Sequence, residues 1–312
     1  MKVAQIGNFE PSHSTENELL RAMRYGVHWD VDPVQENDVA GWGRVTARVA
    51  EYDLVLWTRT ASLSPDHAAQ WALIEAAEAA GVPTVAYHLD RWWGLRREAE
   101  VKREPFFRCA YVCTADGGHE DAWTSVGVNH LWYPPAVSQW ECRPGTPRPE
   151  YAADVAFVGG WDGYGHSEAW HRPALVNHLR STLGDRVRFF PARGEPAIRG
   201  RALRDLYASV KVVVGDSCIL SPGEHHYWSD RVPETTGRGA YLVHVDTPGL
   251  GDAHPSVGRW PMGDWDQLDA LVSIALDDDE GRGQLSAHAA EETFEAHTYT
   301  DRMIRLAADL AL

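Results

Sequence analysis

The chain has 312 residues and a formal net charge of −16, with 45 acidic residues against 29 Lys and Arg, and a globular chain of this length usually divides into two domains. The acidic balance disfavours a protein that coats nucleic acid, and no stretch approaches the roughly 18 consecutive apolar residues of a membrane-spanning helix. The polar start MKVAQIGNFEP and the four scattered cysteines disfavour a secretory signal and a disulfide framework, so we expect a soluble, reduced, cytoplasmic protein.

Short apolar runs alternate with helical patterns in the first half of the chain. The runs are rich in β-branched and aromatic residues, as buried parallel strands are, and cover residues 3–6, 53–57, 82–87 and 110–114. A helix follows the first run, capped by Ser14 or by Thr15, with Glu18 completing a capping box if Thr15 is the cap. A second helix covers 65–80. This alternation predicts an α/β fold with a doubly wound parallel sheet.

A proline-rich stretch separates the two halves. Residues 134–149 contain five prolines and little periodicity, which predicts a linker over 138–152. The alternation then resumes, with strands at 154–158, 187–190, 211–214 and 240–245, and helices at 173–183, 201–208, 265–276, 286–294 and 300–312. We expect two Rossmann-like domains, residues 1–137 and 153–296, with a ligand cleft between them.

The loop after the first predicted strand is the first candidate site, because doubly wound sheets bind ligands beyond the carboxyl ends of their strands. This loop lacks the GxGxxG fingerprint, which disfavours a nicotinamide-dependent dehydrogenase. Polar side chains nevertheless gather at the helix start, namely His13, Ser14, Thr15 and Glu16. We interpret them as a substrate loop; a plain strand–helix turn is the alternative.

His88 and Asp90 follow the strand at 82–87 and precede Arg-Trp-Trp. A histidine and an aspartate at a strand end suit acid–base or hydroxyl-binding chemistry, and a structural histidine is the alternative. No third ligand stands at zinc spacing. Cys109 and Cys113 flank a buried strand and are expected in the core.

The second half offers an anion site in two segments. Gly159 and Gly160 follow the strand at 154–158, where glycine lets the backbone approach a diphosphate closely. In residues 225–240, Glu234 could hold a ribose diol and Arg231 could meet phosphates. The alternatives are helix-end electrostatics for Glu234 and a solvated surface charge for Arg231.

Four segments in this order carry a resemblance to a known family: FVGG-x5-H-x5-R, LYASVKVVVGDSC, YWSDRVPETTGRGAYLVH and EAHTYTDRM. The chain resembles the GT-B glycosyltransferases of the spore-maturation-protein, or glycosyl transferases group 1, type, strongest over residues 154–302. The resemblance implies two Rossmann-like domains facing each other across a cleft, with residues 297–312 crossing back to the N-terminal domain. It also implies metal-independent, retaining transfer from a nucleotide-diphosphate sugar of the UDP-sugar type, with no cofactor.

The resemblance further implies roles for individual residues. In this family two glutamates eight positions apart contact the donor; Glu234 matches the second, and His226 stands at the position of the first. The donor-binding residues would be Gly159, Gly160, His166, Arg193, His226, Arg231, Glu234 and Thr235. The catalytic residues would be His88, Asp90 and Arg231. The acceptor-binding residues would be Asn8, His13, Ser14, Thr15, Glu16 and Trp92.

Other functions stay open at the level of sequence. The acceptor could be a small molecule, a glycan or a hydroxymethylated base in DNA, and the arginines of 186–204 could then contact the DNA backbone. A nucleotide-sugar epimerase would need no acceptor, and a catalytically silent protein would bind the nucleotide sugar without hydrolysing it. The oligomeric state is not predicted.

Overall fold

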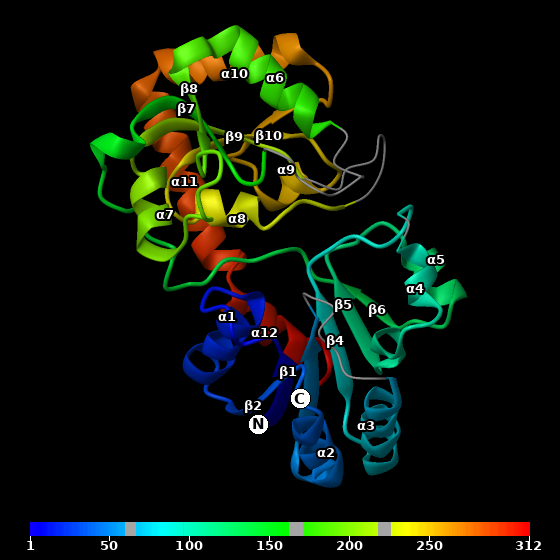
Figure 1. Ribbon diagram of the computed structural model, residues 1–312. Coiled ribbons are helices and arrows are strands. Elements are labelled where there is room, and N and C mark those ends of the chain that lie inside the picture. Colours follow the sequence, from blue (N-terminus) through cyan, green and yellow to red (C-terminus); the bar gives the residue numbers. More distant parts are fainter. Residues whose placement is uncertain (60–66, 96, 162–170, 218–225) are drawn as a thin grey trace. The chain divides into compact units, whose positions relative to one another are not determined.

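The computed structural model describes residues 1–59, 67–95, 97–161, 171–217 and 226–312. The chain forms two compact units, each built on its own sheet (Figure 1). Unit 1 contains Met1–Pro134 and Tyr299–Leu312, and unit 2 contains Pro135–Thr298. Both sheets are parallel throughout, as the alternation of strands and helices predicts.

The sheet of unit 1 has the strand order β2-β1-β3-β4-β5-β6. Its strands are β1 (Lys2–Gly7), β2 (Asp30–Gln35), β3 (Leu54–Thr58), β4 (Thr84–His88), β5 (Tyr111–Thr114) and β6 (His130–Trp132). The helices are α1 (Thr15–Arg21), the π-helix η1 (Ala22–Gly26), α2 (Val39–Ala47), η2 (Val49–Glu51), α3 (His67–Ala80), α4 (Glu98–Val101), η3 (Pro105–Arg108), α5 (Glu120–Ser125) and α12 (Tyr299–Asp309).

The sequence patterns do not predict the strands β2 and β6 of unit 1 or its helices α2, α4 and α5. The edge strand β2 reads DVDPVQ and buries only Val31 and Val34, so it has no apolar run to reveal it. Its Pro33 is tolerated because an edge strand leaves one side of its ladder unpaired. The strand β6 has three residues, and α2 contains two glycines that lower its helix propensity.

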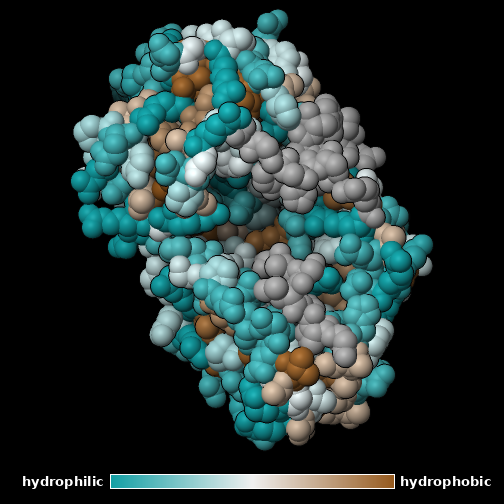
Figure 2. Space-filling view, in the orientation of Figure 1, coloured by the Kyte–Doolittle hydropathy of each residue, from teal (hydrophilic) through white to brown (hydrophobic). Residues whose placement is uncertain are grey.

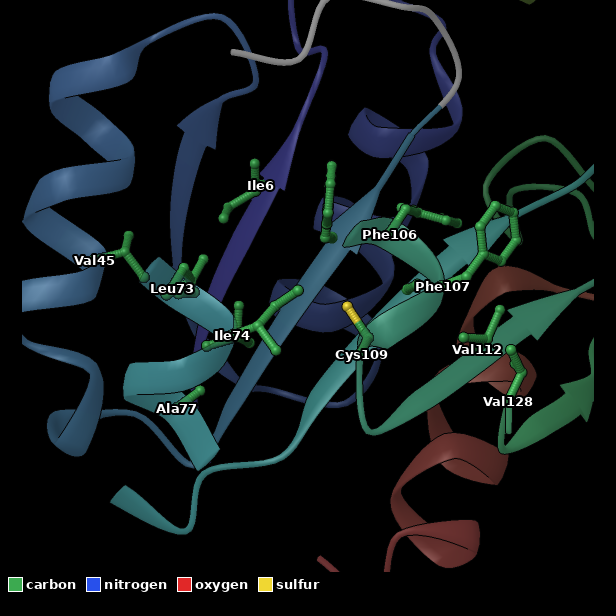
Figure 3. Close-up of a cluster of buried hydrophobic side chains, with 14 of the residues drawn as sticks. Ile6, Val45, Leu73, Ile74, Ala77, Phe106, Phe107, Cys109, Val112 and Val128 are labelled. Atoms are coloured by element: carbon green, nitrogen blue, oxygen red, sulfur yellow. The ribbon is translucent and has the colours of Figure 1, made fainter. Parts of the chain in front are cut away.

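The core of unit 1 lies between the sheet and the layer of α2 and α3 (Figure 3). Val45 comes from α2, and Leu73, Ile74 and Ala77 come from α3. The ring of Trp57 on β3 stands edge-on to Trp42 and to Phe106, with both ring centroids at 5.0 Å. Cys109 and Cys113 are buried, as expected. Several of the chain's 14 tryptophans, Trp42 and Trp57 among them, therefore serve the packing of this core.

The opposite face of the unit 1 sheet carries α1, η1 and α12 (Figure 1). At Gly26 an added Cβ would lie 2.4 Å from Oγ1 of Thr300, so this glycine allows α12 to pack closely. Tyr133 donates a hydrogen bond to Asp309 at 2.7 Å, and Nε of Arg302 donates to the carbonyl of Pro134 at 2.8 Å. The terminal helix is therefore part of unit 1, although unit 2 precedes it in the chain.

The sheet of unit 2 has the strand order β11-β10-β9-β7-β8. Its strands are β7 (Ala153–Val158), β8 (Val187–Phe190), β9 (Val210–Gly215), β10 (Tyr241–Val245) and β11 (Gly258–Trp260). The helices are η4 (Pro149–Tyr151), α6 (Arg172–Leu183), η5 (Gly184–Arg186), α7 (Gly200–Tyr207), α8 (Arg231–Thr236), α9 (Leu250–Ala253), α10 (Trp265–Asp277) and α11 (Asp279–Ala296). Figure 1 shows α6 and α10 on one face of this sheet, with α7 and α8 on the other.

Residues 135–149 of the proline-rich stretch belong to unit 2, and the later part of this segment packs along α7. The backbone N–H of Thr146 donates to Asp205 at 2.8 Å, and that of Arg148 donates to Ser209 at 2.7 Å. An added Cβ at Gly145 would lie 2.3 Å from the carbonyl carbon of Arg204. Residues 144–149 thus form an extended segment, which is held by hydrogen bonds to side chains in α7 and just after it.

None of the helices in the described ranges is both long and apolar enough to cross a membrane. The face seen in Figure 2 is predominantly hydrophilic, which agrees with the acidic composition.

Candidate functional site

The two sheets share one topology. In each, the first strand of the unit, β1 or β7, lies between the second and the third strands. The chain reverses direction across the sheet at this point, and ligands of doubly wound proteins bind beyond the carboxyl ends of the strands there. The candidate sites are therefore the carboxyl edge of β1 and β3 in unit 1, and that of β7 and β9 in unit 2.

Arg231 lies across the carboxyl edge of unit 2. An added Cβ at Gly159, which follows β7, would lie 2.4 Å from Nη2 of Arg231, and one at Gly215, which ends β9, would lie 3.9 Å from its Cδ. Gly159 also has a φ of 142°, which disfavours any side chain. Arg231 forms no hydrogen bond or salt bridge with any described residue. Its guanidinium is thus a half-buried cation left available at this edge.

A second arginine at this edge is fully engaged. Nε of Arg172 lies 3.0 Å from both carboxylate oxygens of Asp216, Nη2 donates to Oδ1 at 2.6 Å, and Nη1 donates to the carbonyl of Gly160 at 2.9 Å. Nε2 of His171 lies 3.0 Å from the same carboxylate. Burial alone would raise the pKa of Asp216, but the hydrogen bonds and charges of His171 and Arg172 lower it well below its ordinary value. Asp216 therefore neutralises Arg172 and fixes the turn at Gly160.

Ser217 connects the end of β9 to the start of α8. Its hydroxyl accepts the backbone N–H of Ser229 at 2.8 Å and lies 3.4 Å from Nε2 of His244. The proton of neutral His244 is on Nδ1, which donates to the carbonyl of Val245 at 2.8 Å, and burial lowers the pKa of His244 to about 4. These contacts fix the segment that leads into Arg231.

The remaining predicted donor residues have different surroundings. Glu234 is half-buried, and its pKa is raised by burial and by the charge of Asp230. The side chain of Thr235 is buried and contacts the hydroxyl of Tyr207 at 3.2 Å. An added Cβ at Gly249 would lie 2.4 Å from the ring of His226, so this ring packs against the loop after β10.

Two further residues complete the predicted donor set. Arg193 is exposed in the loop after β8. His166 lies outside the described residues. The structure thus brings Gly159, Gly160 and Arg231 together at one edge.

Several arginines of residues 186–204 are engaged within unit 2. Arg186 pairs with Asp154 at 2.8 Å, and Arg204 pairs with Glu141 at 2.7 Å. Arg188 donates to the carbonyl of Glu150 at 2.7 Å. Because these three arginines are held by contacts within unit 2, they do not form a free basic stripe that could bind a DNA backbone.

In unit 1, His88 ends β4, and its neutral imidazole can donate a hydrogen bond from Nε2. The backbone N–H of Asp90 donates to its Nδ1 at 3.0 Å, so the proton of the neutral ring is on Nε2. Burial lowers the pKa of His88 to about 4, which keeps the ring neutral near pH 7. Trp92 is buried with its ring edge-on to His88 at 5.1 Å, and Asp90 pairs with Arg97 at 3.0 Å. The structure therefore brings the predicted residues His88, Asp90 and Trp92 together.

The residues predicted after β1 divide between structural and exposed positions. Ser14 is the N-cap of α1, where its hydroxyl accepts the N–H of Asn17 at 3.2 Å and donates to the carbonyl of Asn8 at 2.9 Å. Thr15 is the first helical residue, so the alternative capping box of Thr15 and Glu18 does not form.

The neighbouring positions differ in burial. His13 is exposed, whereas Glu16 is fully buried against Gly7, where an added Cβ would lie 2.4 Å from its Cγ. The hydroxyl of Thr58, at the end of the adjacent strand β3, is buried and has no hydrogen-bond partner among the described residues.

Sequence reasoning missed three polar residues at the carboxyl edges of the two sheets: Arg172, Asp216 and Asp116. Asp216 and Asp116 each follow a predicted strand closely, and this position is the signal that could have found them. Arg172 ends the motif FVGG-x5-H-x5-R but had no role assigned. Among the described residues, no group of three or more His, Cys, Asp and Glu is placed to hold a metal ion.

Solved structures with the same fold cover nearly the whole chain. HepE of Anabaena, in complex with UDP-glucose, is 12% identical with a TM-score of 0.60, and 99% of each chain is covered. Sucrose-phosphate synthase of Thermosynechococcus elongatus is 13% identical with a TM-score of 0.61 and the same coverage. An α-glucosyltransferase in complex with UDP and a 13-mer DNA containing an HMU base is 9% identical with a TM-score of 0.65, over 99% of this chain and 98% of that one. A search of curated proteins finds no match.

The strand order of the two sheets and the likeness to these solved structures show the GT-B fold. The family model described as glycosyl transferase-like matches residues 153–308, half of the chain. The protein belongs to this glycosyl transferase-like family. The family, the GT-B fold and the enzyme class predicted from the sequence are confirmed.

Proposed function

We propose that the protein transfers a sugar from a UDP-sugar to an acceptor hydroxyl, with retention of anomeric configuration and without a metal ion. The donor would bind at the carboxyl edge of unit 2, and the acceptor at that of unit 1. The solved structures of this fold support the choice of nucleotide, because the HepE structure contains UDP-glucose and the α-glucosyltransferase structure contains UDP.

The observation that carries the donor site is the contrast between the two arginines beside the glycine turn. Asp216 neutralises Arg172, whereas Arg231 has no carboxylate partner among the described residues and lies against Gly159. A diphosphate would supply the missing anion, and the absence of side chains at Gly159 and Gly160 leaves room for it to approach the backbone.

Arg231 also supports chemistry without a metal. Breaking the anomeric C–O bond leaves negative charge on the departing UDP, and a preorganised cation stabilises that charge as it develops. EDTA treatment is expected to leave transfer unchanged, and restoration of EDTA-inhibited transfer by Mg²⁺ or Mn²⁺ would refute metal independence.

The tautomer of His88 supports retention. An inverting transferase needs a general base to deprotonate the acceptor, but Nδ1 of His88 already accepts the N–H of Asp90 and Nε2 carries the proton. His88 is thus suited to donate a hydrogen bond to the transferred sugar. NMR of the product formed from UDP-α-glucose tests this directly, since a β-linked product would contradict it.

Glu234 is proposed to bind the ribose of the donor. Its carboxylate accepts no hydrogen bond from the described residues, and ribose hydroxyls would provide donors. Replacing Glu234 with Ala should weaken UDP binding by about tenfold or more, since a hydrogen bond to a charged group contributes about 1.5–3 kcal/mol. Calorimetry with UDP measures this, with the exposed Glu291→Ala as the matched control; unchanged affinity would remove Glu234 from the donor site.

A hydroxymethylated base in DNA is the second candidate acceptor, because an α-glucosyltransferase with bound DNA shares the fold. The net negative charge of both units disfavours this acceptor, since unit 1 has 21 acidic and 14 basic residues and unit 2 has 24 acidic and 15 basic residues. A DNA-binding protein depends on cations that neutralise phosphates, so its affinity falls steeply with salt. Salt-dependent binding of hydroxymethylated DNA, followed by its glucosylation, would favour this acceptor over a small molecule.

Donor binding can be tested before the acceptor is known. Thermal shifts with UDP, UDP-glucose and other nucleotide sugars should show stabilisation, because a ligand that binds only the native state raises Tm. Arg231→Ala should reduce the shift. Absence of a shift with every nucleotide sugar would refute the proposed donor site.

A further inference from the structure

Asp116 follows β5 and anchors the loop that begins after His88. Its carboxylate is fully buried, and Oδ2 accepts the backbone N–H groups of both Trp92 and Trp93 at 2.8 Å. Its own N–H donates to Oγ1 of Thr114 at 3.1 Å, which holds Asp116 to the end of the sheet. One carboxylate oxygen therefore fixes two consecutive amides of a loop from another part of the chain.

The other end of this loop is bound to His88. The N–H of Asp90 donates to Nδ1 of His88, and the ring of Trp92 packs edge-on against the imidazole. Arg97 stabilises the middle of this loop. Its Nε donates to the carbonyl of Arg91 at 2.7 Å, and its Nη1 donates to Asp90 at 3.0 Å. Displacing the Trp92 and Trp93 amides would therefore move both groups that hold the imidazole.

We propose that Asp116 is a positioning residue, which acts through the Asp90–Trp93 loop to hold His88 as the Nε2–H donor. The inference rests on the proposed function of His88 toward the transferred sugar. A loop whose role was only structural would leave the tautomer of His88 unaffected.

The charged groups that face Asp116 come from two elements. Nε of Arg91 lies 3.9 Å from Oδ1, too far for a hydrogen bond, and Nε2 of His119 lies 3.8 Å from the same oxygen. Burial raises the pKa of Asp116 to about 6, while the amides of Trp93 and Trp92 and the charges of Arg91 and Arg97 act in the opposite direction. Protonation below pH 6 thus replaces a charged acceptor by a weaker neutral one.

The experiment follows the ring nitrogens of His88 by NMR in the full-length ¹⁵N-labelled protein. In the wild type at pH 7.5, His88 should be in the Nε2–H tautomer alone. In Asp116→Asn both tautomers should appear, because the neutral amide holds the loop less tightly. The exposed Asp121→Asn in α5 is the matched control and should behave as the wild type. A pure Nε2–H tautomer in Asp116→Asn would overturn the proposal.

A pH titration of the wild type provides a second test that needs no variant. The amide signals of Trp92 and Trp93 and the ring signals of His88 should change together, with a midpoint near pH 6. His119→Gln should keep this shared transition. Loss of the transition in His119→Gln, or separate midpoints for the two sets of signals, would overturn the assignment to Asp116.

Activity separates this inference from the proposed function. With UDP-glucose as the donor, Asp116→Asn should slow transfer about tenfold at pH 7.5, since small misplacements of a catalytic group have effects of this order or larger. The Kd for UDP should stay within about twofold. A changed tautomer with unchanged transfer would refute the role of His88, whereas an unchanged tautomer would refute positioning by Asp116.

Discussion

Two buried aspartates at equivalent edges of the two sheets behave in opposite ways. Asp116 in unit 1 and Asp216 in unit 2 are both fully buried, and each follows a parallel strand. Burial raises the pKa of Asp116 to about 6, whereas the pKa of Asp216 is lowered despite its burial. The difference lies in the guanidinium partners: Arg172 makes short hydrogen bonds to Asp216, but Arg91 lies 3.9 Å from Asp116.

The same contrast extends to the cations of the two edges. At the edge of unit 1, Arg59 pairs with Glu104 at 3.4 Å and Arg97 with Asp90 at 3.0 Å. At the edge of unit 2, Asp216 engages Arg172, and Arg231 has no carboxylate partner among the described residues. Partner geometry rather than burial thus distinguishes the proposed donor edge of unit 2 from the proposed acceptor edge of unit 1.

The largest effect is expected from breaking the buried ion pair of unit 2. Asp216→Ala leaves Arg172 buried without its partner, and the free energy of unfolding should fall by about 3–5 kcal/mol. Asp116→Ala should cost less, about 1–3 kcal/mol, because it leaves two neutral amides unpaired. Urea denaturation of both variants measures the difference, and equal losses would contradict the contrast between the aspartates.

Loss of the available cation should affect chemistry more than stability. Arg231→Ala should lower kcat for sugar transfer about 100- to 1000-fold, as removal of one charge-stabilising donor does in other enzymes. Arg186→Ala is the control, because Arg186 is exposed and paired with Asp154. If Kd and kcat/KM changed by the same factor, Arg231 would bind the ground state and the transition state equally.

The two aspartates should also give stability profiles of opposite slope. Asp116 has a raised folded pKa, so the folded state binds a proton more tightly and stability falls as the pH rises from about 4 to 6, by about 3 kcal/mol. Asp216 has a lowered pKa, so its contribution is present above its unfolded pKa and is lost as the pH falls through the folded value. Unfolding free energies of the wild type and Asp116→Asn across pH 4–7 test this; parallel profiles would contradict it.

Two neutral histidines of unit 1 are predicted to differ in role, with His88 acting in the proposed catalysis and His130 in packing. Burial lowers the pKa of both His88 and His130 to about 4, but His130 stacks on Trp123 and contacts Thr114. His88→Ala should lower transfer about 10- to 100-fold with little change in the Kd for UDP, each tenfold being about 1.4 kcal/mol. His130→Ala should lower Tm with little change in kcat. A large loss of UDP affinity in His88→Ala would move His88 into the donor site.

The smallest effect concerns Ser14, which caps α1. Ser14→Ala should lower the free energy of unfolding by about 1 kcal/mol, because one N-terminal amide loses its acceptor. Transfer should be unchanged in this variant once it is folded, and Thr15→Ala is the matched control. A loss of transfer without a loss of stability would support a direct acceptor contact by Ser14.

The interior strands and longer helices could be predicted from the sequence because their apolar residues have the period of the element they form. The runs that became β3, β4, β7 and β9 are buried on both faces, so their hydrophobicity is nearly continuous. The edge strand β2 buries only Val31 and Val34 and therefore has no such signal. For the candidate site, the sequence indicated Gly159 from its place after a strand and Arg231 from its charge.

The sequence by itself determined where the strands end, and therefore which polar residues could reach a carboxyl edge. It could not determine which arginine would keep its charge available. Asp216 stands 44 positions from Arg172 and much nearer in sequence to Arg231, yet it pairs with Arg172. Only the tertiary structure decided this, because parallel strands bring together side chains by their order in the sheet and not by their distance along the chain.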